Sequence, residues 1–446
     1  MRNGRTEAQP AAVPSRAKQA GETPDRWSWV EPSVWTERML TALETGIKGG
    51  KWYSLIDKIS SVANLKSAFT QVKRNDGSAG VDHVTIRMFE AHLEENLQRL
   101  SESLQAGSYR PQPIRRVWIP KPGSKEKRPL GIPTVRDRVA QAAARNVLEP
   151  IFERDFAAQS YGFRPERGAK DALRRVNALL KAGYVHVVDA DLQSYFDTIP
   201  HQPLLEQVRG KVADGKVVDL LEAYLGQEVM ESAKHWTPEG GTPQGAVISP
   251  LLSNIYLDPL DHRMVQLGYE MVRYADDFVI LCRSQSEAQR ALCEVEAWTT
   301  AAGLRLHPEK TRIVDASQHG GFDFLGYHFE RGYRWPSKKS LRKLQDKIRV
   351  KTKRTHGHSL QQVISELAKI QKGWFEYFKH SRGIRSFEKL DKWIRMRLRS
   401  ILRHRQKRKG RSRGRDHNLW PNSFFAEKGL FSFLAAHAQA RQPSLR

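Results

Sequence analysis

Hydrophobic and polar positions alternate along the chain with two different periods, which predicts a protein of mixed helices and strands. Apolar side chains recur every three or four positions over residues 55–69 and 89–104, so we expect two amphipathic helices there. Short extended runs at residues 115–119 and 130–132 flank Lys121-Pro122-Gly123-Ser124-Lys125, a composition typical of a hairpin turn.

The central part of the chain continues this mixture. Residues 139–156, 249–260 and 286–302 have helical spacing, residues 184–188 have the composition of a strand, and residues 271–281 that of two strands joined by a tight turn. Helices that alternate with mostly hairpin-linked strands indicate an α+β domain. Beyond Arg331 the helical spacing persists in strongly basic segments, which predicts a domain boundary near residue 335.

The composition narrows the class of protein. A chain of 446 residues is long enough for two or three domains. No apolar run reaches the roughly 18 residues that cross a bilayer, and the first 25 residues lack the apolar stretch of a secretory signal. We therefore expect a cytoplasmic protein without a membrane partner. Its two cysteines, Cys282 and Cys293, are too few for a disulfide framework, and we expect both to be buried.

The net charge of +25 is concentrated in one segment of the chain. Residues 331–415 contain 29 lysines and arginines against five acidic residues, whereas the rest contains 45 against 44. Such a segment suits a polyanionic partner, because each neutralised phosphate releases counterions. The alternative is a solvated basic face without a partner.

Two pairs of carboxylates at the ends of apolar strands are the most visible chemistry. Val187-Val188 is followed by Asp189-Ala190-Asp191, and Met271-Val272 is followed by Arg273-Tyr274-Ala275-Asp276-Asp277. Adjacent carboxylates in an apolar hairpin need compensating positive charge, which Mg²⁺ supplies through oxygen ligands. If the strands are neighbours, the acids can hold two Mg²⁺ about 4 Å apart for nucleotidyl transfer. Each acid alone suits a turn or cap equally well, and alternation does not choose between Asp189 and Asp191.

At these residues the sequence resembles the reverse transcriptases that group II introns encode, which also act as maturases. Tyr274-Ala275-Asp276-Asp277 matches that family's Tyr-Ala-Asp-Asp box, and the segment from Asp189 to His201 matches its first metal-binding block. The resemblance continues over residues 55–390, in the expected order. Further matches are Arg128-Pro129-Leu130-Gly131-Ile132-Pro133, Tyr161-Gly162-Phe163-Arg164-Pro165, Gly241-Thr242-Pro243-Gln244-Gly245 with the helix after it, the segment from Gly303 to Thr311, and Phe324-Leu325-Gly326-Tyr327.

The resemblance implies a catalytic role for Asp191, Asp276 and Asp277. Leu192 joins these three in the implied metal set, and the implied cofactor is a pair of Mg²⁺ ions, with Mn²⁺ as a substitute. Asp189 is then structural.

The resemblance also implies a site for the incoming deoxynucleotide. Lys127 and Arg128 would grip its triphosphate. Phe196 would exclude a 2′-hydroxyl, and Gln244 would contact the nascent base pair. The alternatives are a plain basic hairpin for Lys127 and Arg128, a core aromatic residue for Phe196 and an ordinary turn before a helix for Gln244.

The basic segment resembles two further regions of the family. Gly373-Trp374-Phe375-Glu376-Tyr377-Phe378 resembles the thumb motif called domain X, which implies RNA contacts by Trp374, Tyr377, Lys379 and Arg382. A buried aromatic cluster is the alternative for Trp374, Tyr377 and Phe378. Residues 395–415 resemble a short DNA-binding tail. No cysteine follows Cys293, unlike family members with an HNH endonuclease, so we expect a bacterial class C-like protein that does not cleave its target alone.

The implied fold is the right-hand polymerase, α+β, with fingers, an antiparallel palm sheet and a helical thumb. We expect a flexible leader at residues 1–26, a helical extension at 27–108, fingers and palm at 109–335, domain X at 336–392 and a basic tail at 393–446.

The implied function is RNA-directed DNA synthesis combined with splicing of a group II intron and its retrohoming. Partners would be the intron RNA, a DNA target or primer and dNTPs, in a bacterial cytoplasmic ribonucleoprotein. The alternatives are a splicing cofactor without polymerase activity, a related enzyme recruited to defence or repair, and an RNA-dependent RNA polymerase.

Overall fold

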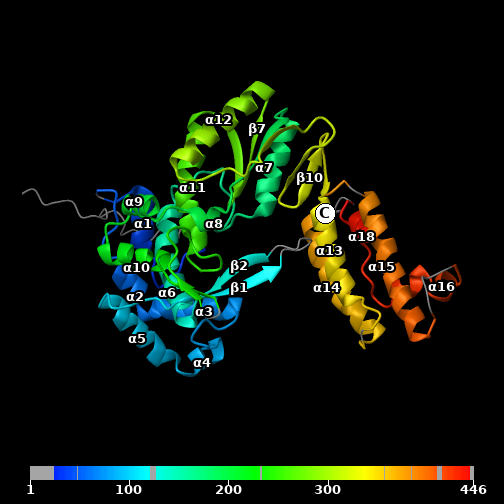
Figure 1. Cartoon of the computed structure of the whole chain (residues 1–446), viewed down its shortest axis with the longest axis horizontal. Helices are drawn as coiled ribbons and strands as arrows, with labels where there is room; N and C mark the ends of the chain where they lie inside the picture. The colour runs from blue at the N-terminus through cyan, green and yellow to red at the C-terminus, as the bar shows by residue number, and fades with distance from the viewer. Residues whose placement is uncertain are drawn as a thin grey trace, which may run out of the picture. The chain divides into compact units, whose positions relative to one another are not determined.

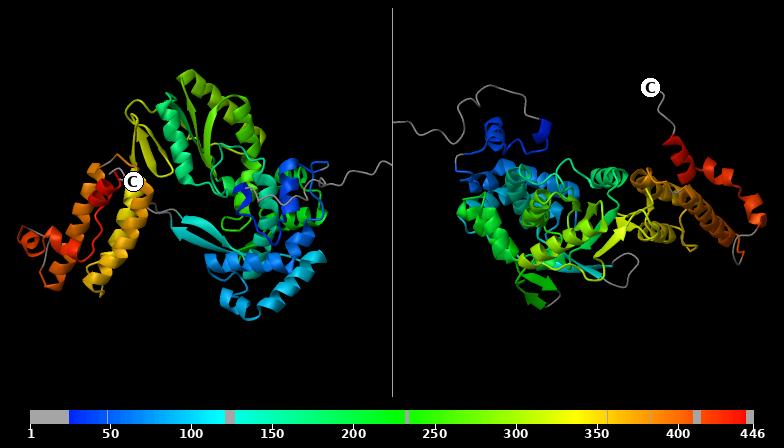
Figure 2. Two further views of the ribbon diagram at one scale, coloured as in Figure 1. Left: turned by 180° about the vertical axis from the view of Figure 1, so that it is seen from behind. Right: turned by 90° about the horizontal axis from the view of Figure 1, so that it is seen from above.

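The computed structural model describes residues 25–47, 49–120, 127–231, 234–355, 357–382, 384–408 and 414–441. These residues form two compact units (Figures 1 and 2). The N-terminal unit contains the described residues up to 176 together with residues 188–313, and the C-terminal unit contains residues 177–187 and those from 314 onward. The predicted leader and the predicted hairpin turn at Lys121 to Lys125 lie outside the described residues.

Helices make up the first part of the N-terminal unit. They are η2 (Asp25–Trp27), α1 (Glu37–Thr45), α2 (Ile56–Ser60), α3 (Val62–Asn75), α4 (Ile86–Ala91) and α5 (Leu93–Gln105). The expectation of two helices was wrong, because the chain leaves helical geometry at Ser61 (ψ 127°) and at His92 (φ −125°). At the first break, the Asn64 amide donates to the carbonyl oxygen of Lys58 at 2.9 Å, which satisfies an acceptor near the end of α2.

The predicted hairpin is confirmed as β1 (Ile114–Pro120) and β2 (Lys127–Ile132), which pair antiparallel with Ile119 opposite Arg128. Two short strands, β4 (Val229–Glu231) and β5 (Lys234–Trp236), extend this sheet in the order β2-β1-β4-β5. Behind it, α6 (Val135–Glu153) is buried along most of its length, because it crosses the unit's core.

A second sheet carries the two pairs of carboxylates. Its order is β6-β7-β3-β8, and its strands are β3 (His186–Asp191), β6 (Glu270–Tyr274), β7 (Asp277–Cys282) and β8 (Arg312–Asp315). Strand β3 begins two residues later than predicted. The remaining helices are α7 (Ala169–Lys181), α8 (Tyr195–Thr198), α9 (His201–Arg209), α10 (Gly215–Leu225), α11 (Ser249–Gln266) and α12 (Gln285–Ala301). Cys282 is buried as expected, whereas Cys293 is exposed on α12.

The C-terminal unit begins with a sheet and continues as helices. Its strands β9 (Phe322–Phe324), β10 (Tyr327–Glu330) and β11 (Tyr333–Pro336) form an antiparallel sheet. Its helices are α13 (Lys338–Lys351), α14 (Leu360–Phe378), α15 (Ile384–Arg405), α16 (Gly414–Leu419), α17 (Asn422–Glu427) and α18 (Phe433–Gln439). A separate apolar core, which includes Phe375, Phe387 and Phe433, holds these helices together.

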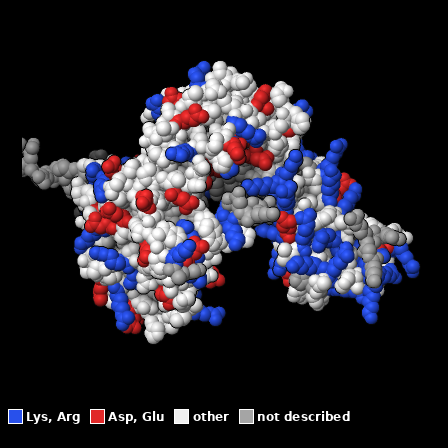
Figure 3. Space-filling model, in the orientation of Figure 1, with Lys and Arg blue, Asp and Glu red and all other residues white. Residues whose placement is uncertain are grey.

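Charge is distributed differently over the two units. Lysine and arginine crowd the visible face of the C-terminal helices, whereas both signs are mixed over the N-terminal unit (Figure 3). Among the described residues, no helix is both long and apolar enough to cross a membrane.

Candidate active site

The two pairs of carboxylates lie on neighbouring strands. Asp191 ends β3, Asp277 begins β7, and Asp276 occupies the turn just before it, while β3 and β7 are adjacent in the sheet. Burial raises the pKa of Asp276, and the negative charge of Asp191 raises it further. The condition set by the sequence, that the strands be neighbours, is therefore met.

Each acid of β3 has a cationic neighbour. The Lys310 ammonium lies 2.5 Å from Oδ2 of Asp191, and Nε of Arg312 lies 3.3 Å from Oδ2 of Asp189. Asp189 is the less exposed of the two carboxylates, at 17% against 32% for Asp191. The Asp191 carboxylate is therefore the more accessible of the two.

The turn between β6 and β7 is held by a buried arginine. Tyr274 pairs with Asp277, and Ala275 between them adopts a left-handed φ of 60°, which is unfavourable for a residue with a side chain. Arg273 is fully buried and donates to the carbonyl oxygen of Ala275 at 2.9 Å. Its Nε donates to both oxygens of Asp261 on α11, at 2.8 and 3.0 Å. Burial lowers the pKa of Arg273, but the Asp261 carboxylate outweighs this effect and the net shift is upward.

A second residue of α11 links the same turn to Gly162. Asn254 of α11 accepts from Nη1 of Arg273 at 2.9 Å and donates to the carbonyl oxygen of Gly162 at 2.9 Å. A Cβ atom on Gly162 would lie 2.8 Å from the carbonyl carbon of Tyr274 and closer still to the amide nitrogen of Ala275. Only glycine fits against this backbone.

The donor set suits a hard divalent cation. Asp276 is a partly buried carboxylate close to a second acid, and its pKa stays raised although the charges of Arg128 and Lys310 lower it. A hard divalent cation would supply the further positive charge that this pair of acids needs. The Leu192 side chain is a buried hydrocarbon without a ligand atom, so this residue would coordinate only through its main-chain carbonyl oxygen. Among the described residues, no three or more side chains of His, Cys, Asp or Glu already form a group that could hold a metal.

Strand β2 directs its two predicted triphosphate ligands to opposite faces, because Lys127 and Arg128 are consecutive in a strand. The positive charge of Arg128 lowers the pKa of Asp276 against the larger upward effect of burial, so the two residues interact electrostatically.

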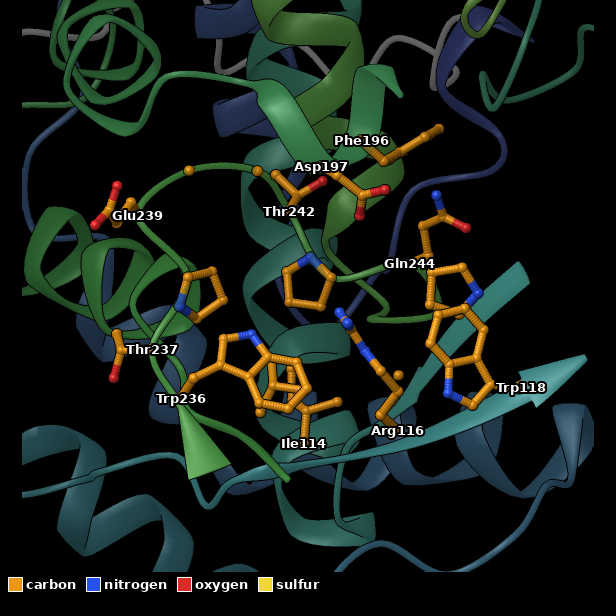
Figure 4. Close-up of a pocket in the computed structure, with 17 residues that line it drawn as sticks. Ile114, Arg116, Trp118, Phe196, Asp197, Trp236, Thr237, Glu239, Thr242 and Gln244 are labelled. Carbon is orange, nitrogen blue, oxygen red and sulfur yellow. The ribbon is translucent and has the colours of Figure 1, made fainter. Parts of the chain in front are cut away.

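A cavity of about 670 Å³ lies on the other face of the β1–β2 hairpin (Figure 4). Arg116 and Trp118 of β1 line it, and the Arg116 guanidinium lies 4.8 Å from the centre of the Trp236 ring. Phe196 and Gln244 also line it, whereas Asp191, Asp276, Asp277 and Arg128 do not. The structure thus brings Phe196 and Gln244 together but separates them from Arg128 by the thickness of the hairpin.

The predicted RNA-binding residues lie at the end of α14 and just beyond it. The centre of the Trp374 ring lies 4.5 Å from that of Phe378 and 5.5 Å from that of Phe433. The Tyr377 hydroxyl donates to the carbonyl oxygen of Leu325 at 2.9 Å. These contacts favour the alternative, an aromatic cluster. Lys379 pairs with Glu376 at 2.9 Å, and the Arg382 guanidinium lies 5.0 Å from the centre of the Tyr333 ring.

Sequence reasoning missed the residues that orient the site. Arg273 and Lys310 stand inside recognised motifs but received no role, and Asp261 received none either. The available signal was Arg273 itself, a charged residue within an apolar strand that requires a buried partner.

Comparisons with known proteins agree with the motifs. Residues 119–329 match the family "Reverse transcriptase (RNA-dependent DNA polymerase)", and residues 341–420 match "Group II intron, maturase-specific domain". Protein YkfC of Escherichia coli (strain K12) is 34% identical over 345 residues, which cover 68% of this chain and 86% of YkfC. The group II intron-encoded protein LtrA of Lactococcus lactis subsp. cremoris is 40% identical over 180 residues, which cover 40% of this chain but only 30% of LtrA.

Among solved structures, a chain of the "Partial Cas6-RT-Cas1--Cas2 complex" aligns with 55% of this chain and 42% of its own length, at 23% identity and a TM-score of 0.36. That likeness is too low to support an argument about function.

Proposed function

The chain belongs to the group II intron-encoded reverse transcriptases and maturases, and on that premise we propose that it copies RNA into DNA at the carboxylates of β3 and β7. The observation that carries this proposal is the adjacency of Asp191 to the turn that bears Asp276 and Asp277. We further propose that it binds its intron RNA, assists splicing and reverse transcribes the intron during retrohoming. The match of residues 341–420 to the maturase-specific domain supports this second part.

The residues suggest how the reaction is assisted. A pair of Mg²⁺ ions would activate a primer 3′-hydroxyl and stabilise the leaving pyrophosphate. Asp191, Asp276 and Asp277 would hold them, and the Arg273 network keeps the carboxylates of the turn in place. Occupation of Asp191 by a cation would release Lys310, whose ammonium then becomes available to phosphate.

The nucleotide site follows from the same framework. Arg128 would draw the triphosphate toward Asp276, since its charge already acts on that residue. Phe196 would exclude the 2′-hydroxyl and Gln244 would contact the base pair. Lys127 would approach the triphosphate from the face of the hairpin that borders the cavity, because it shares that face with Pro129.

Two alternatives remain as competing hypotheses. A splicing cofactor with an idle polymerase would bind intron RNA but synthesise no DNA. A related enzyme in defence or repair would polymerise, but no catalytic intron RNA would flank its gene.

Primer extension on an RNA template, with dNTPs and Mg²⁺, tests the proposal. We expect extension by the wild type and its loss in Asp276→Ala and Asp277→Ala, with RNA affinity retained because these acids do not attract phosphate. Asp219→Ala is the matched control, since Asp219 is an exposed acid on α10. Extension that persists in the two turn variants would refute the metal assignment.

A further inference from the structure

A cleft on the C-terminal unit combines aromatic and cationic side chains from three distant parts of the chain. It measures about 490 Å³ and is lined by Tyr333, Trp335, Arg382 and Arg441. This volume lies within the roughly 300–1,000 Å³ of pockets that hold small molecules. Of the four residues, only Arg382 was singled out by the sequence.

The β10–β11 hairpin places the two rings on one face. Arg331 and Gly332 form its two-residue turn, with φ values of 51° and 72°, the geometry that matches the twist of a hairpin. Tyr333 and Trp335 then alternate with Arg334 and point to the same side of β11. Tyr333 remains 49% exposed although it is a large aromatic residue.

Backbone and side-chain contacts bring the two arginines to this face. The amide of Arg382 donates to the carbonyl oxygen of Arg334 at 2.9 Å, which fixes Arg382 beside β11. His437 of α18 lies 3.0 Å from the carbonyl oxygen of Ser381, so the helix that precedes Arg441 is anchored at the residue before Arg382. Asp391 further fixes the start of α18, because it accepts from the amide of Phe433 at 3.0 Å.

The charges in the cleft are not neutralised by the protein. Over the part of the chain that the structure describes, neither Arg382 nor Arg441 has an ion pair with an acidic side chain. Two acids, Asp323 and Glu330, lie on the same face of the β9–β11 sheet as Tyr333 and Trp335. Both contact His328, and neither lines the cleft. Hydrogen bonding to Asp323 raises the pKa of His328, and both acids lie within ion-pair distance of that imidazole.

We propose that this cleft binds a nucleotide of single-stranded RNA, with the base stacked on Tyr333 or Trp335 and the phosphate held by Arg382 and Arg441. Rings recognise unstacked bases, and guanidinium forks recognise phosphate oxygens. This inference rests on the proposed function in one respect, that intron RNA is the natural polyanion. A phosphorylated peptide offers the same charge but no base for the two rings to stack on.

Photo-crosslinking on the full chain tests the site directly. The probe is a single-stranded RNA of about 12 nucleotides with 4-thiouridine at alternate positions, and mass spectrometry maps the crosslinked peptides. We expect a crosslink at Tyr333 or Trp335. It should disappear in the double variant Arg382→Gln/Arg441→Gln and persist in Arg87→Gln/Arg209→Gln, which removes the same charge from two exposed positions of the N-terminal unit.

Affinity measurements give a second readout. Tyr333→Ala should weaken RNA binding by about fivefold or more, whereas Tyr333→Phe should retain it, because stacking needs only the ring. The slope of log affinity against log salt should fall by about 1.4 in Arg382→Gln/Arg441→Gln, or about 0.7 for each phosphate that the variant no longer neutralises.

Three results would overturn the proposal. The first is the absence of any crosslink in residues 328–336. The second is an equal loss of the crosslink in both double variants. The third is displacement of the RNA by a doubly phosphorylated peptide at a lower concentration than by unlabelled RNA. Wild-type primer extension on the same preparation tests the polymerase separately. A protein that crosslinks at Trp335 but does not polymerise would therefore refute the proposed polymerase activity and would still support RNA binding in the cleft.

Discussion

Replacing Gly162 with alanine adds one methyl group against the turn that carries Asp276. The new Cβ would lie 2.8 Å from the carbonyl carbon of Tyr274, and ordinary contact begins at 3.4 Å. The turn must therefore move by more than about 0.6 Å, since the amide nitrogen of Ala275 lies closer still and both partners are backbone atoms that no side-chain rotation can clear. A misplacement of about 1 Å at a catalytic site can cost about 100-fold in rate. We expect Gly162→Ala to slow nucleotide incorporation by roughly 10- to 100-fold.

The assay is single-turnover primer extension on RNA, together with a thermal denaturation curve. Overpacking costs about 1–3 kcal/mol, so the variant should still fold at low temperature. Gly215→Ala is the control, because a Cβ on Gly215 meets no atom within 4 Å. If folded Gly162→Ala incorporated nucleotides within about threefold of the wild-type rate, close packing at Gly162 would not be what positions the carboxylates.

Three further perturbations separate stability from chemistry. Asp261→Ala leaves the Arg273 guanidinium buried without its carboxylate, which should cost about 3–5 kcal/mol of unfolding free energy in urea titrations; a loss below about 1 kcal/mol would contradict the network. Phe196→Ala should reduce the preference for dGTP over GTP by roughly tenfold or more, and an unchanged preference would remove it as the steric gate. Because folding raises the pKa of Asp276, metal-free protein loses stability as pH rises through that raised pKa. Mg²⁺ should therefore raise Tm less as the pH is lowered toward the ordinary carboxyl pKa of 3.8, and a shift that does not depend on pH would count against Asp276 as a ligand.

The elements of the fold were predictable where one local signal dominated. The β1–β2 hairpin and the β6–β7 hairpin each combine apolar strands with a turn, and both were confirmed. The single helix expected over residues 55–69 is instead two helices, α2 and α3, and the start of α2 depends on a distant contact. Asp214, far along the chain, accepts from the amides of Leu55 and Ile56 at the start of α2, at 2.7 and 2.9 Å. No periodicity within residues 55–69 reports that contact.

The residues of the candidate site were likewise predictable only in part. Asp276 and Asp277 were visible because adjacent acids in an apolar hairpin are costly. Asp191 could be chosen over Asp189 only through the family resemblance, and the two ion pairs now give a physical distinction between them. The separation of Lys127 from Arg128 follows from strand alternation, but only once the strand is known to include both residues.

The residues that orient the site also stabilise the fold, and this makes them distinguishable from the ligands. Arg273 is buried, and its removal from water is offset only by acceptors on Asp261, Asn254 and Ala275. Substitutions in this network should therefore lower activity and stability together. Substitutions of Asp277, which lies at the start of β7 beside the turn, should lower activity far more than stability. A plot of rate against unfolding free energy should accordingly place the two groups on different lines, and a single line through both would mean that the carboxylates act only through the fold.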